Sequence, residues 1–170
     1  MIRSSRAMGA TGAKTVESTT HQRSIHIDAP VEKVFDYLED PDTTYAVISE
    51  TPTSRIDRLV QGELTDATMT PGGGVGTTWS FTARLSIFHV DATYIREEYV
   101  PNKRIVDRNP DARCGVAFDF KPDATGTTLT MAWLDSSRVP LLTTLWDRIY
   151  WDGDHDLDAM LRSVKNAVET

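Results

Sequence analysis

The sequence predicts an α+β domain in which a curved antiparallel sheet wraps around a long C-terminal helix, with elements in the order β-α-α-β6-α. Three observations support this prediction. Two short segments with helical apolar spacing lie near the N-terminus, residues 54–138 alternate with a period of two, and a long helical stripe runs toward Glu169. Short turns between the central strands favour antiparallel neighbours, because parallel strands need long crossover connections.

The length of the chain, 170 residues, fits a single domain. We expect residues 1–22 to be a flexible N-terminal tail and residues 23–170 to form the folded domain. The first segment is rich in Ser, Thr, Gly and Ala and carries no apolar pattern. It also lacks the apolar run of a secretory signal.

The N-terminal elements are expected to be one strand and two helices. Residues 23–28 alternate apolar and polar side chains, which predicts a half-buried strand. A helix follows, with Asp28 or Ala29 as its N-cap and Pro30 in its first turn, where a missing N–H costs nothing. The next proline ends this helix, and a second short helix spans residues 42–49.

Six strands are expected in the central region, and one reversal must fall within residues 85–89. Without it, one strand would be implausibly long. The sequence does not decide which face of the strands at 90–108 points to the core, because both faces carry apolar and charged side chains. The expected strands are 55–61, 77–85, 90–99, 104–108, 114–120 and 129–133.

The final helix is expected to start at Pro140 and to present one apolar stripe to the sheet. The stripe is interrupted at 150–156, where Gly153 falls on the inner face. Glycine inside a helix costs about 0.5–1 kcal/mol relative to alanine. The interruption therefore marks either a bend in the helix or a stretch without large side chains on its inner face. We expect space for a ligand between this stretch and the sheet. The stripe consists of Leu142, Leu145, Trp146, Ile149, Leu157, Met160, Leu161, Val164 and Val168.

Five stretches carry a family resemblance: Ile25–Phe35, Gly76-Thr77, Tyr94–Pro101, Gly126–Thr130 and Met160–Lys165. Together with the order of elements, they resemble the START-like (SRPBCC) helix-grip superfamily, in particular its polyketide cyclase/dehydrase and lipid-transport branch. The resemblance implies a sheet that grips the last helix with a cavity between them. It also implies relatives that bind lipids, sterols or polyketides, some of which catalyse cyclisation or dehydration. The superfamily offers no shared catalytic motif, so catalytic residues stay unknown.

Large apolar side chains and one glycine are the candidate ligand-binding residues. A filled core is the alternative interpretation, because protein interiors are close-packed. The resemblance favours a cavity. The candidates are Trp79, Phe81, Tyr94, Phe118, Phe120, Met131, Trp133, Trp146, Ile149, Tyr150 and Gly153.

Charged residues in or beside the strands are the candidates for acid–base chemistry, since burial shifts a carboxyl pKa toward neutrality. Alternation along the strand places Asp119 on the solvent face, whereas it does not decide which face Arg96 and Asp107 occupy. The other two are Glu97 and Asp135.

Three functions remain. The first is binding of a small hydrophobic or aromatic metabolite, lipid-like or polyketide-like. The second is a polyketide cyclase, aromatase or dehydratase-type enzyme in the same cavity. The third is a partner protein with a collapsed cavity. Two or more buried, mutually bonded titratable groups would favour the enzyme, and a filled interior would favour the third.

The composition argues against several other functions. A net charge of −7 opposes binding to nucleic acid and to anionic membranes. No apolar stretch approaches the roughly 18 residues of a membrane span, so we expect no stable membrane insertion. The acidic run 152–158 fits no metal pattern and reads as a solvated helix face, and we expect neither metal nor cofactor. The single cysteine, Cys114, fits a cytoplasmic protein, and a homodimer is compatible with these observations.

Overall fold

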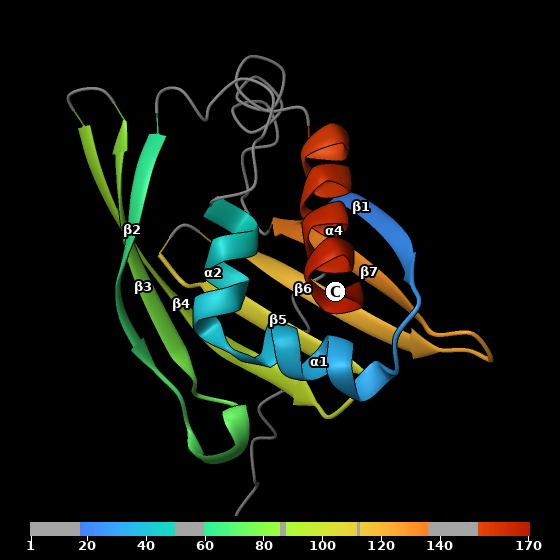
Figure 1. Ribbon diagram of the computed structural model, residues 1–170. Helices are drawn as coiled ribbons and strands as arrows, with labels where there is room; N and C mark the ends of the chain where they lie inside the picture. Colours follow the sequence, from blue (N-terminus) through green and yellow to red (C-terminus); the bar gives the residue numbers. More distant parts are fainter. Residues whose placement is uncertain (1–17, 50–59, 86–87, 112, 136–152) are drawn as a thin grey trace, which may run out of the picture.

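The computed structural model describes residues 18–49, 60–85, 88–111, 113–135 and 153–170. Its described elements form one curved, seven-stranded antiparallel sheet whose concave face carries the helices (Figure 1). The strand order is β1-β7-β6-β5-β4-β3-β2. The elements are β1 (Ser18–Ile27), α1 (Val31–Glu39), α2 (Pro41–Ser49), β2 (Val60–Thr68), η1 (Pro71–Gly73), β3 (Thr78–Leu85), β4 (Phe88–Val100), β5 (Arg104–Asn109), β6 (Cys114–Pro122), β7 (Thr127–Asp135) and α4 (Gly153–Glu169).

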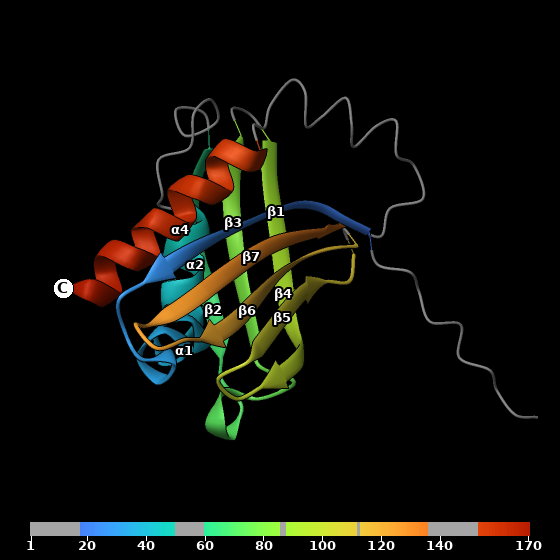
Figure 2. The same ribbon diagram turned by 90° about the vertical axis from the view of Figure 1, so that its right-hand side faces the viewer.

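The turned view shows that α4 runs across β1 and β7, on the same side of the sheet as α1 and α2 (Figure 2). This arrangement confirms the α+β helix-grip prediction. No helix in the described parts of the chain is long and apolar enough to cross a membrane.

The first strand and helix differ in detail from the prediction. β1 begins at Ser18, which pairs with Asp135, so residues 18–22 belong to the sheet and not to a tail. The N-cap of α1 is Pro30, without a side-chain hydrogen bond, and not Asp28 or Ala29. The carboxylate of Asp28 instead lies 3.1 Å from the imidazole of His26.

The meander of strands is confirmed, including the reversal between β3 and β4, where Leu85 pairs with Phe88. β2 continues to Thr68, beyond the end of the expected strand at 55–61, of which residues 55–59 lie outside the described residues. β2 is an edge strand, and residues 65–68 are exposed. Residues 65–68 therefore lack the alternation that marks a half-buried strand.

A bulge between Arg96 and Glu98 settles the faces of β4. A bulge shifts the alternation of side chains by one residue. Tyr94, Arg96 and Tyr99 consequently all face the helices, and the ring of Tyr99 packs edge-on against Phe35 of α1 at 5.5 Å.

The main core fills the space between α1, α4 and strands β1, β5, β6 and β7. Every predicted stripe residue of α4 within the described part is buried. The core consists of Ile27, Ala29, Val34, Phe35, Leu38, Val47, Ile105, Val116, Phe118, Phe120, Leu129, Met131, Leu157, Met160, Leu161, Val164 and Val168.

The acidic start of α4 is paired with β1. Asp154 forms ion pairs with Arg23 and, at 3.2 Å, with His21. Asp156 is only 5 % exposed, so the acidic run is not simply a solvated face as expected. Within the described residues, no group of three or more His, Cys, Asp or Glu side chains is placed to hold a metal ion.

Candidate functional site

Four aromatic side chains form a cluster on the helix-facing side of β3 and β4, which we call the aromatic wall: Tyr45, Trp79, Phe81 and Tyr94. Trp79 and Tyr94 are cross-strand partners whose rings stack at 4.3 Å with an interplanar angle of 6°. Phe81 lies 6.1 Å from Trp79, and Tyr45 of α2 approaches Trp79 edge-on at 6.4 Å. Such contacts contribute about 0.5–1.5 kcal/mol each beyond area burial, so the wall is a rigid surface.

The aromatic wall lies beside the main core and is not part of it. Trp79 and Tyr94 are buried, whereas Phe81 is only half-buried. Cys114 of β6 contacts this cluster and is also half-buried. This part of the concave face is therefore less completely covered than the core under α1 and α4.

A buried ion pair stands next to the wall. Arg96 and Asp107 both have fully buried side chains, and Arg96 Nε donates to Asp107 Oδ1 at 2.9 Å. Arg96 Nη2 and Trp79 Nε1 both donate to Asp107 Oδ2, at 3.2 and 3.0 Å. Arg96 Nη1 donates to the carbonyl oxygens of Glu39 at 2.9 Å and Gly73 at 2.8 Å. The pair thus ties β4 and β5 to the end of α1 and to the β2–β3 loop.

Arg96 and Asp107 are two buried, mutually bonded titratable groups, which is the arrangement expected to favour an enzyme. The carboxylate oxygens of Asp107, however, are already engaged in hydrogen bonds within the protein. Both oxygens of Asp107 accept hydrogen bonds, three in all, from Arg96 and Trp79. A general base must reach the proton that it abstracts. A carboxylate with no exposed surface and with both oxygens engaged is placed to hold structure and not to transfer protons.

Two tyrosines of β4 have raised pKa values. Burial, and then the neighbouring Cys114, raise the pKa of Tyr94 well above its ordinary value. Burial, and then the hydrogen bond that the Tyr99 hydroxyl donates to Glu39, raise the pKa of Tyr99 to about 12. Both phenols therefore keep their protons at neutral pH.

Alkaline pH should consequently weaken the fold. An unfolded tyrosine ionises near pH 10, whereas Tyr99 in the fold keeps its proton to about pH 12. Between these values the unfolded chain binds fewer protons, so the free energy of unfolding should fall as pH rises. Urea midpoints measured at several pH values from 9 to 12 test this. Tyr99→Phe should show a shallower fall than the wild type, and an equally steep fall would contradict the assignment.

The structure divides the predicted ligand-binding residues into three groups. Trp79, Phe81 and Tyr94 belong to the aromatic wall. Trp133 is half-buried and packs beside the main core, into which Phe118, Phe120 and Met131 are fully packed. Trp146, Ile149 and Tyr150 lie outside the described residues, and Gly153 is the first residue of α4 as described.

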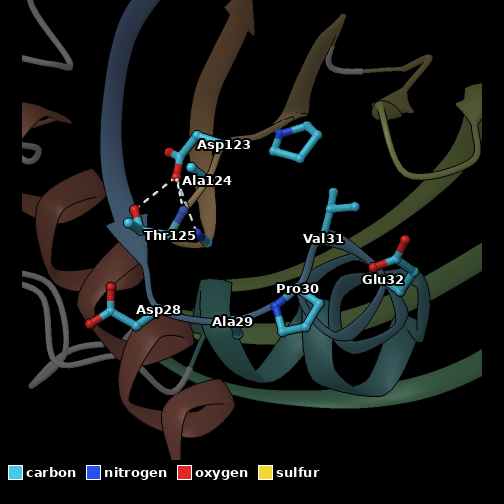
Figure 3. A pocket seen from close by; sticks show the side chains of 10 residues that line it. Asp28, Ala29, Pro30, Val31, Glu32, Asp123, Ala124 and Thr125 are labelled. Carbon is cyan, nitrogen blue, oxygen red and sulfur yellow. Dashed lines mark hydrogen bonds between the residues drawn. The ribbon is translucent and has the colours of Figure 1, made fainter.

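A groove of about 500 Å³ lies on the surface between residues 28–32, which form the β1–α1 turn and the start of α1, and the β6–β7 hairpin, residues 122–126 (Figure 3). Asp123 Oδ1 accepts hydrogen bonds from the backbone N–H and the hydroxyl of Thr125, both at 2.8 Å, and from Gly126 N at 3.1 Å. These bonds, first that from the Thr125 N–H, lower the pKa of Asp123. The carboxylate therefore stabilises the hairpin turn.

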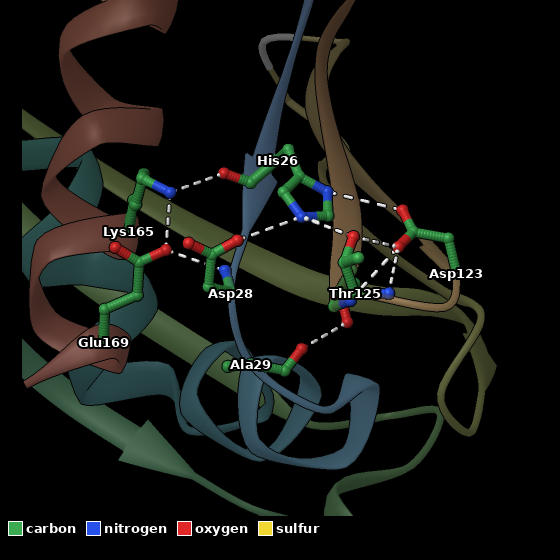
Figure 4. Close-up of polar contacts among 9 residues, drawn as sticks. His26, Asp28, Ala29, Asp123, Thr125, Lys165 and Glu169 are labelled. Atoms are coloured by element: carbon green, nitrogen blue, oxygen red, sulfur yellow. Dashed lines mark hydrogen bonds and ion pairs between the residues drawn. The ribbon is translucent and has the colours of Figure 1, made fainter.

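His26 bridges the two sides of this groove (Figure 4). Its Nε2 lies 3.1 Å from Asp28 Oδ1, and its Nδ1 lies 3.3 Å from Asp123 Oδ2. The Thr125 hydroxyl is 3.3 Å from Nε2, but this hydroxyl already donates to Asp123. An activated nucleophile would donate to the base. We therefore interpret the cluster as structural.

The end of α4 is fixed to the same turn. Lys165 Nζ donates to the His26 carbonyl at 2.8 Å, and Glu169 Oε1 accepts the Asp28 N–H at 2.7 Å (Figure 4). The hydrogen bond from Lys165, and then that from Asp28, lower the pKa of Glu169. No pattern in the sequence predicts these contacts, because each partner is a common surface residue whose role depends on its position in the fold.

A curved antiparallel sheet that holds a C-terminal helix, with aromatic side chains on its concave face, defines a helix-grip protein of the START-like superfamily. The model of the family described as polyketide cyclase / dehydrase and lipid transport matches residues 18–169, and the chain belongs to this family. No curated protein matches the chain.

Solved structures show the same fold at low sequence identity. A Chromobacterium violaceum protein is 16% identical, with a TM-score of 0.59, over 88% of this chain and 97% of that one. The AHSA1-like protein from Aeromonas hydrophila is 17% identical, with a TM-score of 0.53, over 88% and 94%. The Aha1 dimer from Colwellia psychrerythraea is 17% identical, with a TM-score of 0.53, over 87% and 94%.

Proposed function

We propose that this protein binds a small hydrophobic or aromatic molecule, lipid-like or polyketide-like, between the sheet and the helices. The aromatic wall is the observation that carries the proposal, because Phe81 and Cys114 there are only half-buried while Trp79 and Tyr94 form a rigid floor. Ligand pockets are lined mainly by apolar and aromatic side chains with few polar groups. The family's description, which includes lipid transport, supports an apolar ligand.

A cyclase, aromatase or dehydratase is the alternative on the same scaffold. It needs a buried acid or base that can reach the ligand. The Arg96–Asp107 pair is buried, but its hydrogen-bonding atoms are engaged with each other, with Trp79 and with two backbone carbonyls. We therefore propose binding as the function and do not assign a catalytic role to this pair.

Two measurements test the binding function. Native mass spectrometry of protein purified from its host should reveal a co-purifying apolar molecule. Calorimetric titration with fluorene, an aromatic hydrocarbon without hydrogen-bonding groups, should show saturable binding. Phe81→Ala should weaken fluorene binding by about tenfold, as expected when a contacting aromatic residue is truncated.

Thr93→Ala is the matched control. Thr93 lies next to Tyr94 on β4 but is exposed on the convex face, where it bonds Ser80. Its removal should leave fluorene binding unchanged. No co-purifying molecule and no fluorene binding would contradict the proposed function.

A further inference from the structure

The hydroxyl of Tyr94 is held at a fixed point on the aromatic wall. The side chain is 8 % exposed, and its ring stacks on Trp79 at 4.3 Å with planes only 6° apart. The ring therefore has little freedom to turn, and the position of the hydroxyl is set by the two strands. A group oriented in this way before a ligand arrives loses little entropy on binding.

The partner of this hydroxyl is a poor one. Among the described residues, the Tyr94 hydroxyl has one hydrogen-bonding partner, Cys114 Sγ at 3.5 Å. A thiol is a weak acceptor, whereas a phenol is a good donor. A buried hydroxyl with a weak partner is costly and gains free energy when a better acceptor replaces it. Cys114 is only half-buried, so part of this residue remains exposed to solvent.

The protonation state of Tyr94 fits a donor. Burial, and then Cys114, raise its pKa well above the ordinary value, so the phenol is neutral at physiological pH. Of the neutral oxygen groups that it can meet, a carbonyl is the best match, because a carbonyl oxygen accepts without bringing a proton of its own. A ligand hydroxyl would add a second donor, and Cys114 Sγ is the weak acceptor nearest to it.

We propose that the Tyr94 hydroxyl donates a hydrogen bond to a carbonyl oxygen of the bound molecule, which makes the ligand an apolar compound with a ketone, quinone or ester group. This inference rests on the proposed binding function and narrows its ligand class. Tyr94 is then the residue that selects carbonyl compounds over plain hydrocarbons, and Trp79 and Phe81 supply the apolar surface.

Fluorenone and fluorene test this inference, because they share one ring skeleton and differ by a carbonyl in place of a methylene group. Tyr94→Phe keeps the stacked ring and removes the hydroxyl. It should weaken fluorenone binding about three- to tenfold, as expected for one neutral hydrogen bond, and leave fluorene binding unchanged. The infrared carbonyl stretch of bound fluorenone should move to higher wavenumber in the variant.

Cys114→Ala is the matched control, since it removes the sulfur and keeps the tyrosine. Fluorenone binding should stay equal or become tighter. Equal losses for both probes in Tyr94→Phe, or a loss in Cys114→Ala as large as in Tyr94→Phe, would overturn the inference and leave the binding function intact. If Tyr94→Phe does not fold, the wild-type spectrum decides, because a bound carbonyl stretch at its hydrocarbon-solvent position also overturns the inference.

Discussion

Asp107→Asn should lower the free energy of unfolding by about 3–5 kcal/mol, as expected when one partner of a buried ion pair is removed. The substitution keeps the shape of the side chain and removes its charge. Arg96 then becomes a fully buried cation without a counter-charge. It cannot turn toward solvent without giving up its hydrogen bonds to the carbonyls of Glu39 and Gly73. Urea unfolding followed by tryptophan fluorescence measures the loss.

Asp119→Asn makes the same chemical change where the effect should be small. Its carboxylate is 46 % exposed and pairs with Arg104 on the convex face of the sheet. Exposed pairs contribute about 0–1 kcal/mol. Losses of the same size in the two variants would contradict the role assigned to Asp107.

The helices could be predicted from the sequence because their apolar spacing matches the faces that they bury. The stripe from Leu157 to Val168 reads directly as the buried face of α4. The cap of α1 could not be read in the same way. Asp28 is a good N-cap residue by type, but its carboxylate contacts His26, near the end of β1, instead.

Alternation of apolar and polar residues predicts where the strands lie, but it does not predict which face is buried where the alternation is interrupted. The bulge in β4 allows Arg96 and Tyr99, an odd number of residues apart, to face the helices together. No residue type in this stretch announces a bulge. For the same reason the sequence does not decide whether Arg96 is buried, and its partner Asp107 lies on the neighbouring strand.

The candidate site was predictable only in part for the same reason. Trp79, Phe81 and Tyr94 stand out as large aromatic residues in strands, and the structure brings them together. Tyr45 was assigned only to a short helix, because its contact with Trp79 depends on how α2 packs on the sheet. The partnership of Tyr94 with Cys114 likewise arises across strands, at a distance in sequence that no local pattern covers.

Two of the family-like stretches meet in space, which gives them a structural meaning. Thr127 is fully buried, and its hydroxyl donates to the Ala29 carbonyl at 2.9 Å. Gly126 lies against the backbone of Ile27 and Asp28. The β6–β7 hairpin and the β1–α1 turn thus pack backbone to backbone, and the end of α4 bonds to the same turn. These residues build the fold and need not contact a ligand.

Gly126→Ala should therefore destabilise the fold by about 3 kcal/mol or more, at the upper end of the overpacking range. A Cβ atom at this position would lie 2.1 Å from the Ile27 carbonyl oxygen and 3.1 Å from the Ala29 nitrogen, and backbone atoms cannot turn aside as side chains do. Gly74→Ala is the matched control, because its Cβ would meet nothing closer than 3.9 Å. Its backbone, with φ −74° and ψ −166°, also suits alanine, so its stability should change by less than about 1 kcal/mol. Melting temperatures of the two variants compare them directly, and a Gly126→Ala protein as stable as Gly74→Ala would show that the hairpin and the turn do not need this close approach.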